Sequence, residues 1–141
     1  MLTGDTSLLM KNEFGYTTIK TFDELMQFPN DIVEKYSVLT ECGYSSFKEI
    51  QKQYDRRELI ILTLNDNAKL KCTPEHLVVT YDNEIKMVKD LKLNDSLKGF
   101  GLRVIGIEYV NDNAFPVYEI FGIEASNSYF TEKILSWFEK S

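Results

Sequence analysis

The chain has 141 residues, of which 43% are apolar and 13% aromatic, so it is long and apolar enough for one domain with a hydrophobic core. Its net charge of −6 argues against a nucleic-acid-binding surface, which needs clustered Lys and Arg. No apolar stretch approaches the ~20 residues that span a bilayer, and the N-terminus lacks the layout of a signal peptide. We therefore expect a monomer without nucleic-acid or membrane partners.

The two cysteines, Cys42 and Cys72, are far apart in sequence and follow no metal-ligand spacing. A disulfide has no support in this pattern, and a reduced protein in the cytoplasm is the simpler interpretation. We expect no metal and no cofactor. Cys72 is expected to be a small buried strand residue, and Cys42 a partly exposed residue of a turn.

The first part of the chain predicts a hairpin followed by short helical turns. Residues 7–10 and 16–20 are predicted strands on either side of a turn. Thr21, three residues before a glutamate, fits a capping box that opens a helical turn over residues 22–26. Residues 31–35 are either a second helical turn or a loop.

From residue 36 onward, short apolar runs alternate with turn residues, which indicates successive strands. Residues 51–57 are predicted to be a polar connection. Many short strands at close intervals favour an all-β fold of hairpins over a parallel α/β sheet. The predicted strands are residues 36–40, 44–50, 58–64, 69–72, 77–81, 84–87, 101–110, 116–121, 128–130 and 133–136.

A short internal repeat points to two related halves. Residues 19–25 (IKTFDEL) resemble residues 85–91 (IKMVKDL), and each copy follows a strand and a turn. The offset of 66 residues is nearly half the chain. Two similar β halves packed with approximate two-fold symmetry would produce this repeat.

The only histidine, His76, lies in a turn that begins at Thr73. Pro74 cannot donate to a sheet ladder, so the turn is expected to connect two strands. An imidazole can hold or pass a proton near neutral pH. Such a turn can aim a hydroxyl, backbone N–H groups and the imidazole at one point, although a plain strand connection is the simpler interpretation of this stretch alone.

Four stretches, in order, resemble the motifs of inteins, the self-splicing protein inserts, and of related hedgehog-type (Hint) autoprocessing domains. They are Leu2-Thr3-Gly4-Asp5-Thr6, Thr73-Pro74-Glu75-His76, Leu91-Lys92-Leu93-Asn94-Asp95-Ser96-Leu97, and Val117-Tyr118-Glu119-Ile120 followed by Tyr129-Phe130 and Ile134-Leu135-Ser136. The layout most resembles compact phage inteins without a homing endonuclease. It implies a horseshoe-shaped β fold with pseudo-two-fold symmetry. Residues 1–136 would be the splicing domain, and residues 137–141 a degenerate intein end or a downstream flank.

The resemblance also implies catalytic roles. In inteins a Cys or Ser at position 1 attacks the preceding carbonyl and converts the amide to a thioester or ester. Thr73 would hydrogen-bond near that carbonyl or nitrogen, and His76 would supply the proton for the departing nitrogen. Glu119 falls where many inteins carry an acidic residue near the first scissile bond, and an exposed strand residue is an equal alternative. Asp95 is better explained as a carboxylate that stabilises a turn.

The sequence departs from this pattern at both ends. Met1 stands in the place of the nucleophile, and a thioether has no proton to lose. Trp137 and Phe138 stand in the places of the penultimate His and of the terminal Asn, which cyclises to cut the second junction. We therefore expect an inactive form. It is either an engineered or processed domain kept from reacting, or a natural, degenerate domain that has lost splicing.

Two functions from different classes follow. The first is a protein-splicing domain that performs one turnover on its own chain, with its flanking polypeptides (exteins) as partners. The second is a degenerate, non-catalytic β domain that serves as a binding or structural module. A conventional hydrolase lacks a recognisable Ser-His-Asp or Cys-His constellation. Residues 27–35 resemble the place where some phage inteins are split, so a complementary fragment is a further expected partner.

Overall fold

Strands dominate the structure, a computed structural model that describes residues 1–56, 58–99, 102–111 and 115–138. Within these residues lie fourteen strands, two short α-helices and one 3₁₀ turn, so the predicted all-β fold is confirmed. The strands are β1 (Leu2–Thr3), β2 (Ser7–Lys11), β3 (Thr17–Thr21), β4 (Ser37–Thr40), β5 (Gly43–Ser46), β6 (Glu49–Arg56), β7 (Leu59–Leu64), β8 (Lys69–Cys72), β9 (Leu77–Val79), β10 (Ile85–Met87), β11 (Val104–Val110), β12 (Phe115–Phe121), β13 (Ser128–Thr131) and β14 (Ile134–Trp137). The helical segments are α1 (Phe22–Leu25), α2 (Asn30–Val33) and η1 (Val88–Asp90).

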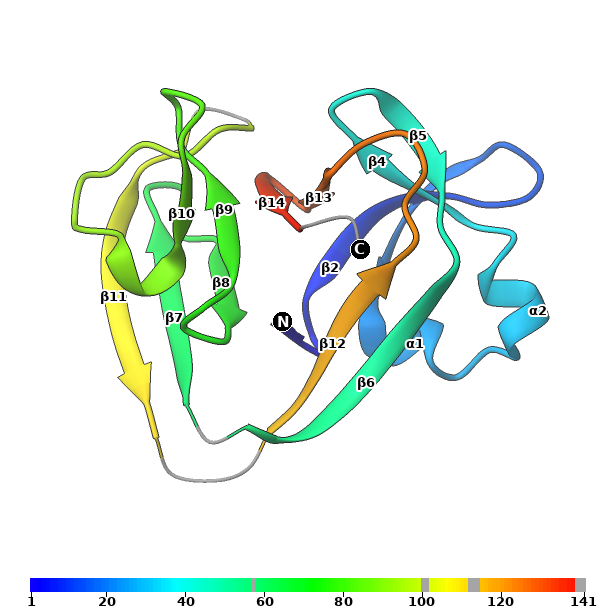
Figure 1. Ribbon diagram of the computed structural model, residues 1–141, viewed down its shortest axis with the longest axis horizontal. Coiled ribbons are helices and arrows are strands. Elements are labelled where there is room, and N and C mark those ends of the chain that lie inside the picture. The colour runs from blue at the N-terminus through cyan, green and yellow to red at the C-terminus, as the bar shows by residue number, and fades with distance from the viewer. Residues whose placement is uncertain (57, 100–101, 112–114, 139–141) are drawn as a thin grey trace.

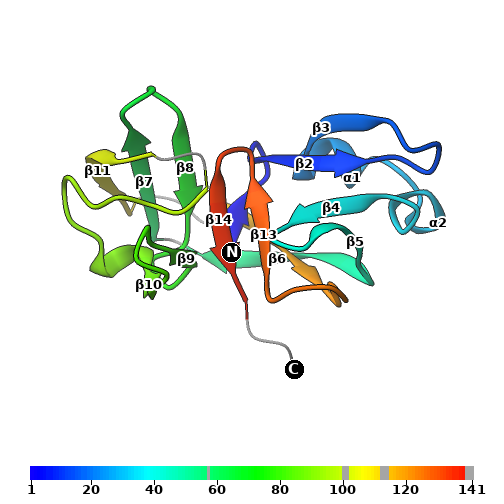
Figure 2. The same cartoon turned by 90° about the horizontal axis from the view of Figure 1, so that it is seen from above.

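The strands form three antiparallel sheets arranged as a horseshoe. A six-stranded sheet has the order β11-β7-β8-β1-β12-β6, and two four-stranded sheets have the orders β10-β9-β14-β13 and β3-β2-β4-β5. Figure 1 shows β7 to β11 in one arm and β2 to β5 in the other, with β6 and β12 rising from the base of the horseshoe along the second arm. Seen from above, β13 and β14 lie between the arms (Figure 2). The N-terminus and the C-terminal hairpin are therefore both in the centre of the molecule.

One continuous cluster of buried apolar side chains runs through both arms. Burial alternates along the strands, as in β2 and β7, because successive side chains point to opposite faces of a sheet. Leu2 of the central strand β1 is fully buried, and its ladder partners are Tyr118 of β12 and Cys72 of β8. The two-residue strand β1 is thus held from both sides, which fixes the position of residue 1. None of the helical segments in the described ranges is long and apolar enough to cross a membrane.

The predicted capping box is present at the start of α1. The Thr21 hydroxyl accepts from the Glu24 N–H, and the Glu24 carboxylate accepts from the Thr21 N–H, both at 3.1 Å. Phe22 and Leu25 are fully buried, so this single turn is anchored to the core. Residues 30–33 form the helix α2, so the segment 31–35, predicted as either a second helical turn or a loop, begins as a helical turn.

The internal repeat corresponds to equivalent elements in the two halves. Residues 19–25 form the end of β3 and α1, and residues 85–91 form β10 and η1. Phe22 and its counterpart Val88 are both buried at the first helical position. The two copies therefore use the same positions to enter the core, as two-fold related halves require.

The symmetry extends to two turns that sequence comparison did not pair, residues 3–6 and 73–76. In each turn the N–H of the last residue donates to the carbonyl of the first threonine at 3.1 Å. The Thr3 hydroxyl donates to the carbonyl oxygen of Lys71, and the Thr73 hydroxyl donates to that of Met1, both at 3.4 Å. The approximate two-fold axis therefore passes between β1 and β8.

Two predicted elements are wrong in their extent. Residues 51–56 belong to the strand β6 and are not a polar connection, while Arg57 lies outside the described residues. β6 is the edge strand beside β12, and edge strands are stabilised by their ladder although they carry few apolar residues. The predicted strand 44–50 is divided between β5 and β6, because the chain changes sheet where the Lys48 N–H donates to the Phe121 carbonyl.

Candidate functional site

The turn that carries His76 is fixed by backbone hydrogen bonds. Thr73 follows the end of β8 and His76 precedes β9, and both residues are buried. The N–H groups of Val88 and Lys89 in η1 donate to the carbonyls of His76 and Pro74, at 2.8 and 3.0 Å. Because the turn is held by β8, β9 and η1 together, its side chains have a defined direction.

Thr73 and His76 both contact the nitrogen of residue 1. The amino group of Met1 donates to Thr73 Oγ1 at 3.1 Å and lies 3.2 Å from His76 Nδ1. The Thr73 N–H donates to the Met1 carbonyl at 2.9 Å. This amino nitrogen stands in for the amide nitrogen that residue 1 has when a polypeptide precedes it. The turn therefore contacts both the nitrogen and the carbonyl oxygen of residue 1.

The hydrogen bonds of His76 select one tautomer of its imidazole. Nδ1 faces the Met1 ammonium, which only donates, so Nδ1 carries no proton. Nε2 therefore carries the proton and donates to Ser136 Oγ at 2.9 Å. Burial lowers the pKa of His76 well below its usual value, and the charge of the N-terminus adds to this effect. The result is a neutral imidazole whose basic nitrogen points at residue 1.

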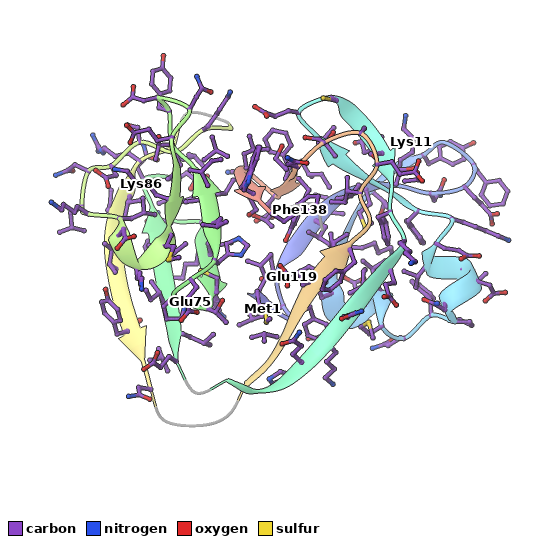
Figure 3. All side chains as sticks on the ribbon, in the orientation of Figure 1. Met1, Lys11, Glu75, Lys86, Glu119 and Phe138 are labelled. Atoms are coloured by element: carbon purple, nitrogen blue, oxygen red, sulfur yellow. The ribbon has the colours of Figure 1, made fainter. Side chains whose placement is uncertain are left out.

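A cavity of about 950 Å³ opens beside this pair. Its wall includes all six of the site residues expected from the sequence: Met1, Thr73, His76, Glu119, Trp137 and Phe138. Figure 3 shows Met1, Glu75, Glu119 and Phe138 around the space between the two arms. Glu119 of β12 is half-buried in that wall, so it is not a plain exposed strand residue.

The C-terminal end of the described chain reaches the same cavity in strand register. Trp137 is the last residue of β14, where it pairs with Leu77 and with Ser128. The Phe138 N–H donates to the Asn127 carbonyl at 2.8 Å, and its ring lies 6.1 Å from that of Tyr129. Both positions are thus integrated in the fold, and they line the same cavity as residue 1.

No protein-family model matches the chain, and a search of curated proteins finds no match. Solved structures match over nearly its whole length. An intein from a hyperthermophile has a TM-score of 0.82 at 18% identity and covers 96% of this chain and 98% of that one. The VidaL intein has a TM-score of 0.78 at 13% identity, with 99% and 97% covered. The chain has the fold of a compact intein. A consensus engineered intein with an atypical split site is 28% identical over 74% of this chain and 83% of that one, with a TM-score of 0.63.

Three further polar residues have structural roles within this intein fold. Asp95 accepts from the Lys92 N–H at 2.9 Å and stabilises a turn, as expected. Cys72 is fully buried, and burial raises the pKa of its thiol to about 12, so it stays protonated. Cys42 is an exposed free thiol at the turn between β4 and β5. None of the described residues forms a group of three or more His, Cys, Asp or Glu side chains that could hold a metal ion.

Sequence reasoning missed Ser136, the partner of His76. The serine lies in a short apolar strand, 60 residues further along the chain, and it is fully buried. A lone hydroxyl at an inward-facing position of a strand is the only sequence signal for such a role. Its partner becomes evident only when the register of β14 against β9 is known.

Proposed function

We propose that this chain is a protein-splicing domain whose interior site is assembled and whose terminal reactive residues are replaced. One observation carries the proposal. Thr73 and His76 contact the nitrogen of residue 1, in the wall of the cavity that also takes positions 137 and 138. Both junctions with flanking polypeptides would therefore open into one chamber, which is what transfer of an acyl group between them requires.

The geometry supports a proton relay at the upstream junction. With a cysteine at position 1, its thiol proton passes to Nδ1 of His76, and the sulfur attacks the preceding carbonyl carbon. The carbon–nitrogen bond breaks, and the proton on Nδ1 moves to the departing nitrogen, which becomes an amine. A neutral imidazole suits this task because it first accepts and then returns one proton. Thr73 keeps the nitrogen of residue 1 in place throughout.

The downstream junction depends on positions 137 and 138. By resemblance to inteins, an Asn at 138 would cyclise and a His at 137 would assist it, after a downstream nucleophile has taken the acyl group. Trp137 and Phe138 have no group for either task, and Met1 has none for the first step. In this form we therefore expect the domain to hold both junctions without cutting them.

The partners on this proposal are the flanking polypeptides, in a monomeric domain. We also propose that it acts in the cytoplasm of a microbial or phage-infected cell, a location supported by its free cysteines.

Residues 27–35 are mostly exposed, and a break there would separate β1 to β3 from the rest. Since β1 lies between β8 and β12, the two fragments would associate through buried strands. Co-expressed fragments that never purify together would contradict this split.

The test restores the missing groups. Met1→Cys, Trp137→His and Phe138→Asn are combined in a chain with one tag upstream and a second, cysteine-initiated tag downstream. Mass spectrometry is expected to find the two tags ligated and the domain released. The matched control carries His76→Ala and is expected to leave the upstream junction intact.

The same experiment decides against the alternative. A restored chain that folds but cuts neither junction would contradict the splicing proposal. It would favour a non-catalytic β module, in which Trp137 and Phe138 are structural residues. That alternative has its own support in the way both side chains are built into the cavity wall.

A further inference from the structure

We propose that Ser136 is a positioning residue for His76: its hydroxyl oxygen accepts a hydrogen bond from Nε2–H, and this keeps Nδ1 unprotonated and directed at the nitrogen of residue 1. The strand that brings the downstream junction to the cavity would then also set the base at the upstream junction. The catalytic consequence rests on the proposed splicing function, whereas the hydrogen bond and the tautomer do not.

The contact is short and buried, and it joins a side chain of β14 to the turn residue that precedes β9. Ser136 Oγ lies 2.9 Å from His76 Nε2, and the serine is fully buried while the histidine is 6% exposed. Ser136 pairs with Val78 in the ladder between β14 and β9. His76 directly precedes β9, two residues before Val78, so the alternation of side chains along the strand places it towards the same face as Val78. The serine and the histidine are thus diagonal neighbours, within reach of each other.

The chemistry of the two neighbours of the imidazole requires an acceptor at this position. The nitrogen of residue 1 only donates, whether it is an ammonium or an amide N–H, so Nδ1 must be the unprotonated nitrogen. The proton then lies on Nε2, inside the protein, where it needs an acceptor. Among the described residues the structure gives Nε2 one such partner, Ser136 Oγ.

Removing the hydroxyl therefore acts on the tautomer. With alanine at 136, the neutral imidazole would bury an N–H group without a partner. Moving the proton to Nδ1, or turning the ring, relieves that cost but directs a donor at the nitrogen of residue 1. Either change removes the basic nitrogen from the place where the proton relay needs it.

The placement of Ser136 couples the two ends of the domain. It precedes Trp137 and Phe138 in the chain, so its position depends on the same register of β14 that brings these residues to the cavity. Until β14 is paired with β9, Nε2 lacks its acceptor. The base at the upstream junction would therefore be set only when the downstream junction is in place.

Because His76 is the only histidine, its ring nitrogens can be observed alone. The full chain is labelled with ¹⁵N-histidine, and long-range ¹H–¹⁵N spectra are recorded near pH 7 for the unsubstituted chain, Ser136→Ala and Ser128→Ala. Ser128 is a matched control, since it is equally buried on the neighbouring strand and its hydroxyl bonds to Ser126 and Glu41.

We expect the unsubstituted chain and Ser128→Ala to show one tautomer, with the proton on Nε2 and slow exchange of that proton with water. Ser136→Ala should lose the slow exchange and shift towards the Nδ1–H form or a mixture. An unsubstituted chain with the proton on Nδ1 overturns the proposal without any variant. So does a folded Ser136→Ala chain with the same tautomer and the same exchange rate as the unsubstituted one. If the alanine variant does not fold, Ser136→Cys, which is similar in size but a weaker acceptor, is expected to show faster exchange, and unchanged exchange in it overturns the proposal.

A second measurement addresses catalysis in the chain with restored termini. A positioned acid–base group contributes ~10²–10⁴-fold to a rate, so Ser136→Ala is expected to slow cleavage at the upstream junction by about tenfold or more, against little change in Ser128→Ala. A tautomer effect in a restored chain that does not splice would contradict the proposed function and leave the role of Ser136 intact. Unchanged tautomer and unchanged cleavage in a splicing chain would contradict the role of Ser136 alone.

Discussion

Because His76 is buried, we predict that the protein loses stability as the pH is lowered below about 6.5, a range in which its carboxylates are still ionised. The pKa of His76 in the folded protein is well below the value of about 6.5 that the unfolded chain has. Below pH 6.5 the unfolded state therefore binds more protons than the folded state, and the free energy of unfolding decreases as the pH falls. Below pH 6.5 the slope is at most about 1.4 kcal/mol per pH unit, so the free energy of unfolding falls by at most about 2 kcal/mol between pH 8 and pH 5. Above pH 6.5 the contribution is fully present.

The assay is urea denaturation at several pH values between 8 and 5, for the unsubstituted chain and for His76→Gln. The glutamine variant is less stable at pH 8, because it disturbs the contacts with Ser136 and residue 1. The difference between the two chains should then shrink towards pH 5, by at most about 2 kcal/mol, since only the unsubstituted chain carries the histidine. Carboxylates contribute equally to both chains and cancel. Two parallel curves, with a constant difference across this range, would refute the reasoning, because they would mean that His76 takes up protons equally in both states.

Three further predictions concern other parts of the fold. Gly4→Ala places a methyl group against the Asp23 carboxylate, which must turn away from the hydrogen bond that it accepts from Tyr118, so the variant should cost about 0.5–1.5 kcal/mol, whereas adding Asp23→Ala removes the obstacle. Urea denaturation should find the double variant more stable than the sum of the two single effects by about 0.5–3 kcal/mol, and strict additivity would exclude the clash. Gly99 has a φ of +136°, and an added Cβ would clash with the backbone carbonyl oxygen of Lys133. Gly99→Ala should therefore lower the melting temperature by about 2–4 °C per kcal/mol lost, and an unchanged melting temperature would contradict the strain. A thiol reagent near pH 8 should label Cys42 alone in the folded chain and Cys72 only in denaturant, since burial raises the pKa of the latter to about 12; two labels without denaturant would contradict its burial.

Local chemistry explains what the sequence predicted correctly. The capping box needs only Thr21 and Glu24, three residues apart, and it forms as predicted. The turn at residues 73–76 follows from a proline between two apolar runs. Asp95 closes a turn with a residue three positions earlier. Each of these features is decided within a few residues, where propensity and side-chain hydrogen bonding dominate.

Long-range pairing explains what it could not predict. β6 is polar, and its strand conformation is stabilised by the ladder with β12, more than sixty residues further along the chain. The contact between Ser136 and His76 likewise depends on the register of β14 against β9. A shift of one residue would turn the serine to the other face. A single sequence contains no local signal for such a register, although it does contain the residues that use it.

The pseudo-two-fold symmetry shows why only one of the two equivalent turns forms a site. The turns at residues 3–6 and 73–76 have the same backbone hydrogen bonds, so the backbone does not distinguish them. Near the first turn, Asp5 forms an ion pair with Lys71 at 2.7 Å, and the adjoining pocket measures only about 70 Å³. The second turn opens on a cavity of about 950 Å³, and β14 supplies a hydrogen-bond acceptor to its histidine. The duplicated fold thus supplies two copies of a turn that hydrogen-bonds to the neighbouring strand. Only the second copy has a large cavity beside it and a histidine that is hydrogen-bonded to the C-terminal hairpin, and the proposed chemistry needs both.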